Sequence, residues 1–154
     1  MKSRTKTRPQ AGVTTSKRAS APVTEAAPPA LSVLIVEDVE DMRLLLEELV
    51  RGAAALGLKL SGSAPSVIDA RLELDRRRPD LVLLDEVLPG ESSDELLADL
   101  VRDGVPVLLM TSMEEANHAL GEGARGRITK PGWKSLEQDR ARIAAEIRAA
   151  LGRH

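Results

Sequence analysis

Charged and polar side chains stand directly after four apolar segments of the chain. They are Glu37, Asp38, Asp85, Thr111 and Lys130. Carboxylates that come close together repel one another, and a divalent cation relieves that repulsion. Hard oxygen ligands suit Mg²⁺, which keeps several of its waters. A hydroxyl and an ammonium beside the carboxylates would complete a set of groups suited to phosphoryl transfer, which depends on positioning and charge neutralisation.

The apolar segments themselves predict the strands of a parallel sheet. Residues 31–36, 81–84 and 105–110 are nearly continuous apolar runs, typical of strands that are covered on both faces. Shorter strands are expected at 58–62 and 127–129. The carboxyl ends of parallel strands lie on one edge of the sheet, where open α/β sheets bind their ligands. The polar side chains should therefore meet at that edge.

Helical spacing of apolar residues predicts a helix after each strand. We expect one at about 41–55 with Asp41 as its cap, one from Ser66 to 76–78, one from Ser92 or Ser93 to Gly104, a short one at 113–120, and a last one from Ser135 to Leu151. Five alternations of strand and helix predict a doubly wound, five-stranded parallel sheet with helices on both faces. The expected strand order is the flavodoxin-like 2-1-3-4-5.

The strand-end residues also have a purely structural interpretation. Asp38, Asp85 and Thr111 could each cap a following helix or turn, and Lys130 could be a solvated charge. This explanation is acceptable for any one of them. It is much weaker for all of them together, because every strand end would then need the same coincidence.

Charge divides the chain into two parts. Residues 1–30 carry six basic residues and one acidic residue, a charge of +5. Because the net charge of the whole chain is −2, the remaining residues carry −7. The first part is rich in Pro, Ala, Ser and Thr and lacks apolar periodicity, so we expect a disordered tail and a single domain at 31–154. An acidic domain should not bind nucleic acid by bulk electrostatics. The tail is either a solubilising extension or a basic arm for an acidic surface.

The composition also indicates in which cellular compartment the protein works. The absence of cysteine excludes disulfides, thiolate catalysis and thiolate metal sites. No apolar run approaches the roughly 20 residues that a membrane span needs. The basic N-terminus lacks the apolar core of a secretory signal. A cytoplasmic protein that contacts no membrane is the resulting expectation.

Four short motifs carry a family resemblance. They are VLIVED at 33–38, LLD at 83–85 with LPG at 88–90, VLLMTS at 107–112, and TKP at 129–131. In this order, each at a strand end, they resemble the receiver domain of two-component response regulators. The resemblance covers about 31–151 and is nearest to stand-alone, chemotaxis-type receivers.

The resemblance implies a role for each site residue. Asp85 would be the phosphoacceptor, and Thr111 and Lys130 would contact the phosphoryl group. Glu37, Asp38, Asp85 and the backbone carbonyl of Val87 would bind Mg²⁺. The peptide bond between Lys130 and Pro131 is expected to be cis, as in the family.

Two positions depart from the family pattern. Receivers commonly carry an aromatic switch residue three positions before the lysine, where this chain has Arg127, and the chain contains no Tyr or Phe at all. Our hypothesis is that Arg127 turns toward a phosphoryl oxygen or toward Glu86. Glu86 should point away from the pocket of Asp85 if strand alternation continues.

The resemblance predicts a phosphorelay protein rather than an enzyme, apart from slow loss of its own phosphoryl group. A histidine kinase or phosphotransfer protein would supply the phosphoryl group. Because no DNA-binding domain follows Leu151, output would pass through a downstream protein target, and the face formed by 113–120, 127–129 and the last helix could form a homodimer. The main alternative is a receiver-fold interaction module that phosphorylation does not control. An aspartyl phosphatase is disfavoured, because Val87 stands where a second aspartate would be needed.

Overall fold

The structure is a computed structural model that describes residues 29–88, 93–112 and 123–153. Its elements, in chain order, are β1 (Leu31–Val36), α1 (Glu40–Arg51), η3 (Ala54–Leu56), β2 (Leu58–Ala64), α2 (Val67–Arg76), β3 (Leu81–Asp85), α3 (Ser93–Arg102), β4 (Val107–Thr111), β5 (Gly126–Thr129), η5 (Trp133–Ser135) and α4 (Leu136–Ala150). The expected helix at 113–120, the tail at 1–28 and the alternative cap Ser92 lie outside the described residues.

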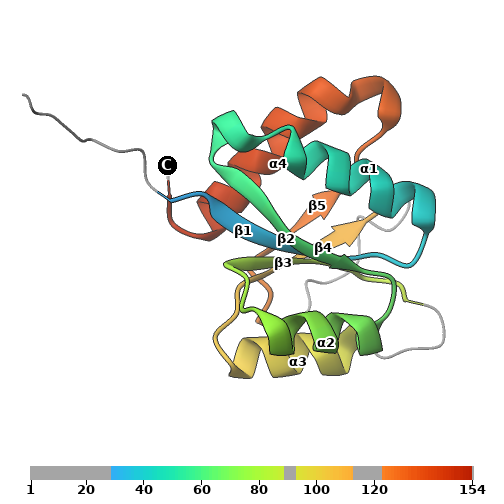
Figure 1. Cartoon of the computed structure of the whole chain (residues 1–154), viewed down its shortest axis with the longest axis vertical. Helices are drawn as coiled ribbons and strands as arrows, with labels where there is room; N and C mark the ends of the chain where they lie inside the picture. Colours follow the sequence, from blue (N-terminus) through green and yellow to red (C-terminus); the bar gives the residue numbers. More distant parts are fainter. Residues whose placement is uncertain (1–28, 89–92, 113–122, 154) are drawn as a thin grey trace, which may run out of the picture.

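The strands form one five-stranded sheet in the order β2-β1-β3-β4-β5, as Figure 1 shows. All four neighbouring pairs are parallel. The predicted doubly wound fold and its flavodoxin-like strand order are confirmed. Strand β3, which carries Asp85 at its end, lies in the middle of the sheet, between β1 and β4.

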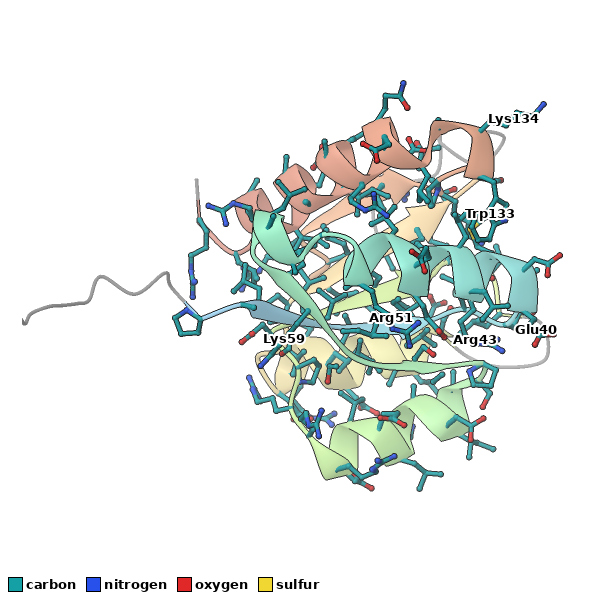
Figure 2. The ribbon with its side chains drawn as sticks, turned by 45° about the horizontal axis from the view of Figure 1, so that its top comes forward. Glu40, Arg43, Arg51, Lys59, Trp133 and Lys134 are labelled. Carbon is teal, nitrogen blue, oxygen red and sulfur yellow. The ribbon has the colours of Figure 1, made fainter. Side chains whose placement is uncertain are left out.

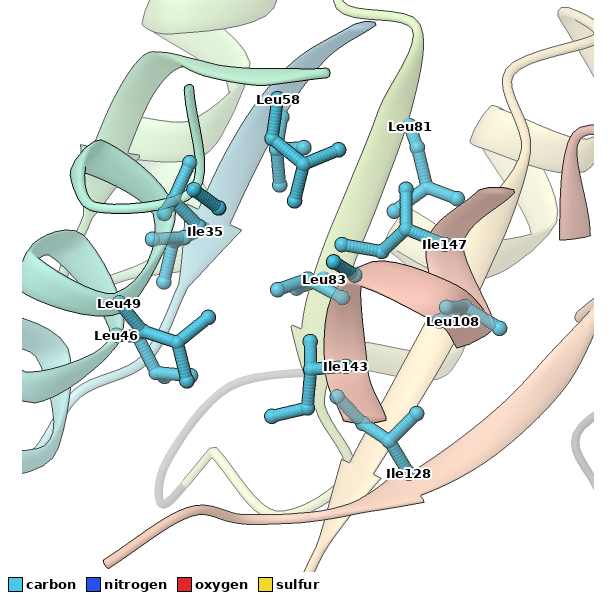
Figure 3. Packing of buried hydrophobic residues seen from close by; sticks show 14 of the residues in the cluster. Ile35, Leu46, Leu49, Leu58, Leu81, Leu83, Leu108, Ile128, Ile143 and Ile147 are labelled. Carbon is cyan, nitrogen blue, oxygen red and sulfur yellow. The ribbon is translucent and has the colours of Figure 1, made fainter. Parts of the chain in front are cut away.

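Helices cover both faces of the sheet, with α1 and α4 on one side and α2 and α3 on the other (Figure 1). The core is therefore split into two aliphatic clusters. The cluster under α1 and α4 contains Ile35, Leu83, Leu108, Ile128 and Ile143, all nearly fully buried (Figure 3). The cluster on the opposite face contains other members of the same strands, such as Leu84 and Leu109. Alternate residues of each strand face opposite sides, which is why an uninterrupted apolar run is needed.

The start of α1 differs from the prediction. The residue that precedes the helix is Val39, with no side-chain cap, and Asp41 lies in the first turn instead. The amide of Val39 donates a hydrogen bond to Oε2 of Glu37 at 3.1 Å. The carboxylates of Glu40 and Asp41 remain near the positive end of the helix dipole, where they are favourable.

Helix α2 begins at the predicted cap, because Oγ of Ser66 accepts a hydrogen bond from the amide of Asp69 at 3.0 Å. Only Ala70 of its apolar residues is fully buried. Ile68 and Leu72, two other apolar residues of the same helix, are 71% and 57% exposed. Within the part of the chain that the structure describes, no helix is both long and apolar enough to span a membrane.

Candidate functional site

Three carboxylates gather at the carboxyl edge of the sheet. Glu37 and Asp38 follow β1, and Asp85 ends the neighbouring strand β3. Ligand oxygens of the three residues all lie within 4.8 Å of one another. Glu37 and Asp85 are buried, whereas Asp38 is accessible to solvent. The sequence-based expectation that these acids meet at one edge agrees with this geometry.

Lys130 is held between two of these carboxylates. Its Nζ lies 2.9 Å from Oε1 of Glu37 and 3.2 Å from Oδ1 of Asp85. Burial disfavours the charged ammonium, but the close contact with Glu37 and the negative charges of Asp85 and Glu37 outweigh this effect and raise the pKa of Lys130. The sequence placed Lys130 at the same edge as the carboxylates, but it did not single out Glu37 as a partner. Glu37 could have been suspected as a partner because its own strand neighbours β3.

Asp85 combines burial with incomplete charge compensation. Its burial raises its pKa to about 6, and repulsion from Glu37 adds to this effect. The hydrogen bond from the amide of Val87 to Oδ1 of Asp85, 3.0 Å long, and the nearby ammonium of Lys130 act in the opposite direction. The two protonation states of this carboxyl are therefore balanced near pH 6, well above the range of an ordinary aspartate.

Thr111 ends β4 beside this group. It is 1% exposed, and its Oγ1 donates a hydrogen bond to the carbonyl oxygen of Ser112 at 3.1 Å. The amide of Lys130 donates to the carbonyl oxygen of Thr111 at 2.9 Å, which extends the pairing of β4 and β5 to the site. Backbone bonding therefore ties the hydroxyl-bearing residue to the lysine-bearing one.

Arg127 and Glu86 form a second ion pair near the site. Nε and Nη2 of Arg127 lie 2.9 Å and 3.1 Å from Oε1 and Oε2 of Glu86, a two-pronged arrangement. The two side chains are 15% and 14% exposed. Of the two partners considered for Arg127, the structure shows Glu86. Glu86 is directed to Arg127, while Asp85 is bonded to Lys130.

The expectation of a cis peptide bond between Lys130 and Pro131 is wrong. None of the described peptide bonds is cis, so Lys130 and Pro131 are joined by a trans bond. The trans form is the lower in energy for most residues before proline, by roughly 0.5–1 kcal/mol. Lys130 reaches both carboxylates from the trans backbone, so the contacts of the site do not require the other isomer.

The capping interpretation holds only for part of the site. Asp85 does accept a turn-type hydrogen bond from the amide two residues on. However, the same carboxylate also contacts Lys130, and Glu37 contacts Lys130 while it accepts the amide of Val39. Turn formation alone does not require a lysine between two buried acids.

Two hollows outside the carboxylate cluster have different linings. A cavity of about 620 Å³ lies at the opposite end of the strands, near Leu31 and Leu56. Its lining is mostly alanine and other apolar residues, with two arginines and no carboxylate. A shallow hollow beside the site is lined by Lys130, Gly132 and Asp139, among others. Trp133, in η5, is 58% exposed and lies at the same end of the molecule as Glu40 (Figure 2).

Comparison with known proteins identifies the class to which this fold and site belong. The family model of the response regulator receiver domain matches residues 33–141. The chain belongs to this family. This result confirms the resemblance that the four strand-end motifs indicated.

The relatives show how much of each protein is shared. The sensory transduction protein RegX3 of Mycolicibacterium smegmatis is 36% identical over 126 residues, which cover 79% of this chain and 51% of that protein. A protein-glutamate methylesterase/protein-glutamine glutaminase of Cereibacter sphaeroides is 33% identical, over 82% of this chain and 36% of that protein. The chain thus spans about a third to a half of these relatives' lengths.

Solved structures agree on the fold. The response regulator domain of Thermotoga maritima CheB matches with a TM-score of 0.68 and 24% identity, over 81% of this chain and 98% of that one. The receiver domain of the sensor histidine kinase PA1611 of Pseudomonas aeruginosa matches with a TM-score of 0.62 and 20% identity, over 80% and 98%. A magnesium ion is coordinated in the active site cleft of the second structure.

Proposed function

We propose that this protein is a single-domain response regulator that accepts a phosphoryl group on Asp85 from a histidine kinase or a phosphotransfer protein. The observation that carries the proposal is the position of Asp85, which lies in contact with Lys130 inside a cluster of three carboxylates. Membership of the receiver family supports it. The protein acts as a phosphoacceptor in a relay rather than as an enzyme that turns over a free substrate.

The acidic cluster fits a magnesium ion. Glu37, Asp38 and Asp85 offer hard oxygen donors within 4.8 Å of one another. Oε1 of Glu37 is buried and accepts no hydrogen bond of good geometry among the described residues, so its contact with Lys130 is an ion pair with coordinating capacity to spare. Glu37 (through a water), Asp38, Asp85 and the carbonyl of Val87 would hold the ion. When bound, Mg²⁺ neutralises the charge of a transferring phosphoryl group.

The reaction needs little beyond positioning. The P–N bond of a phosphohistidine breaks, the imidazole nitrogen keeps the electron pair, and a carboxylate oxygen of Asp85 forms the new P–O bond, which gives an acyl phosphate. The ammonium of Lys130 contacts the nucleophile before transfer and would pair with a phosphoryl oxygen after it. The hydroxyl of Thr111 would donate to another phosphoryl oxygen.

The test is phosphorylation by a small-molecule donor. We expect the protein to gain one phosphoryl group by mass spectrometry when it is incubated with acetyl phosphate and Mg²⁺. D85N should gain none. D99N, which changes an acid of α3 that pairs with Arg71 of α2 away from the site, should react like the wild type. A wild-type protein that stays unmodified, or a D85N variant that reacts equally well, contradicts the proposal.

Output is proposed to pass through protein contacts. The domain at 31–154 would be preceded by a disordered basic tail and would work in the cytoplasm. A downstream protein target would recognise the phosphorylated state, and a homodimer through the 113–120, β5 and α4 face is one form that this recognition could take.

A second candidate is an interaction module of receiver fold that phosphorylation does not control. It is favoured by one observation, the ion pair that holds Arg127 where receivers commonly carry a movable aromatic residue. The two candidates differ in one measurement, because only a switch changes its affinity for its partner when Asp85 is phosphorylated.

A further inference from the structure

The ion pair between Glu86 and Arg127 connects two strands that are not neighbours. Glu86 directly follows β3 and Arg127 lies in β5, with β4 between them. Neighbouring strands are about 4.8 Å apart, so the pair spans roughly twice that distance. Only long side chains can bridge such a gap, and the Glu–Arg combination does so with both prongs of the guanidinium.

Strand alternation places the pair on the same face of the sheet as Thr111. Leu84 and Leu109 belong to the core cluster on the α2 and α3 side, and Glu86 and Thr111 lie two positions further along their strands. Ile128 belongs to the opposite cluster, so Arg127 next to it faces the α2 and α3 side. Arg127 lies opposite Leu109 of β4, and Thr129 lies opposite Thr111. The ion pair therefore crosses β4 close to Thr111, on the same face of the sheet.

The backbone of Glu86 is also fixed. Its amide donates to the carbonyl oxygen of Met110 at 3.1 Å, and its carbonyl oxygen accepts a hydrogen bond from Oγ of Ser93 at 3.3 Å. The residue therefore joins the start of α3, strand β4 and, through Arg127, the edge strand β5. On either side of it in the chain stand Asp85 and Val87, whose amide donates to Asp85.

Such a pair resists opening. Charged two-pronged pairs are among the stronger hydrogen-bonded contacts. Removing one partner of a mostly buried pair leaves the other charge uncompensated, which costs more than the loss of a surface pair. By contrast, an aromatic ring held by packing alone can turn between buried and exposed rotamers.

We propose that Glu86 and Arg127 form a fixed ionic strut over β4, and that they are positioning residues that hold Val87 and Thr111 in place for phosphoryl transfer to Asp85. The strut rests on the proposed function of Asp85 and goes beyond it. It assigns this chain a site that is built in advance, in which the side chain at position 127 stays inside in both states.

The test is a double-mutant cycle with E86Q, R127Q and the double variant E86Q/R127Q. The rate of phosphorylation by acetyl phosphate and the Kd for Mg²⁺, followed by fluorescence of the single tryptophan, are both measured, together with the unfolding free energy. The matched controls are the single variants R71Q and D99N, each of which breaks the 2.8 Å ion pair between α2 and α3, away from the site. E86D adds a variant that keeps the charge but shortens the reach.

Each single variant should lower the phosphorylation rate roughly tenfold and weaken Mg²⁺ binding, because a small displacement of positioned groups has a large effect on rate. The double variant should be no slower than either single one, E86D should behave like E86Q, and the control variants should keep the wild-type rate and affinity. Single variants within twofold of the wild type, effects that multiply in the double variant, or a wild-type-like E86D overturn the strut.

The two proposals fail separately. If the wild type gains no phosphoryl group, the function of Asp85 fails, and the strut is judged on Mg²⁺ affinity and its coupling alone. If the wild type reacts and all the variants react equally, the strut fails and the phosphoacceptor stands.

Discussion

At the scale of single residues, the site is an arrangement of like charges held together by one cation. Lys130 contacts both Glu37 and Asp85, and these acids are nearly inaccessible to solvent. Without the ammonium, the two carboxylates would face one another with their charges unpaired. The lysine therefore has a structural role that is separate from any contact with a phosphoryl group.

Replacing Lys130 by methionine should expose this role. The uncompensated carboxylates should lower the unfolding free energy, measured by urea denaturation without divalent cations, on the order of 2 kcal/mol. Mg²⁺ should restore part of that loss, because it supplies the missing positive charge. The control is K134M at an exposed neighbouring position, and equal stability of the two variants contradicts the structural role.

The titration of Asp85 predicts a dependence of stability on pH. Its pKa is about 6 in the folded protein and near 3.8 in an unfolded chain, so the folded state favours the proton. Stability from this group is fully present below pH 4 and is lost as the pH rises through 6. In metal-free buffer, D85N should remove this loss and be more stable than the wild type at pH 7.5, on the order of 1 kcal/mol. A wild-type stability that rises over this interval relative to D85N contradicts the prediction.

At the scale of elements, the site depends on how strands end and helices begin. Two serines stand before helices but serve differently. The hydroxyl of Ser66 accepts a hydrogen bond from the amide of Asp69 and caps helix α2. The hydroxyl of Ser135 caps no backbone amide of α4 and donates a hydrogen bond to the carboxylate of Asp139 instead. Helix α2 is also held weakly by packing, since Ala70 is its only fully buried residue.

Replacing Ser66 by alanine should therefore destabilise the protein by about 1 kcal/mol, the usual cost of losing a cap that bonds to the backbone. The comparison is I68S, at a 71% exposed position of the same helix, which should change the unfolding free energy by less than about 0.5 kcal/mol. Chemical denaturation of both variants tests the difference, and a larger effect at position 68 is the contrary result.

At the scale of the whole molecule, strand order brings together groups from four chain segments. The sheet order β2-β1-β3-β4-β5 places the ends of β1 and β4 on either side of Asp85, with β5 next to β4. Any ligand of this edge therefore contacts groups that only the complete fold assembles, so binding and folding should be linked.

Mg²⁺ should accordingly raise the stability of the whole domain. At a concentration 100 times the Kd, a ligand that binds only the folded state adds about 2.7 kcal/mol to the unfolding free energy. We expect a Tm that rises with Mg²⁺ concentration and returns to its starting value with a chelator. D38N should weaken this response without a comparable loss of stability in metal-free buffer, because Asp38 is accessible to solvent and the other two acids are not. A Tm that does not respond to Mg²⁺ contradicts the proposed metal site.

The sequence by itself was sufficient to predict the fold and the edge at which the site lies. Continuous apolar runs and the alternation of strand and helix are local features, and connection rules limit their arrangement to few topologies. Because parallel strands end at one edge, residues such as Asp85 and Lys130 could be grouped without coordinates. Their contact is present at 3.2 Å.

Only the tertiary structure decided which side chains contact each other. The second partner of Lys130 and the pairing of Arg127 with Glu86 depend on distances of a few ångströms between elements far apart in the chain. The same holds at the start of α1, where Glu37 accepts the amide of Val39 and Asp41 does not act as the cap. Sequence patterns specify which face and edge a residue occupies, whereas the pairing of charges depends on side-chain reach and on the energetic cost of leaving a buried charge alone.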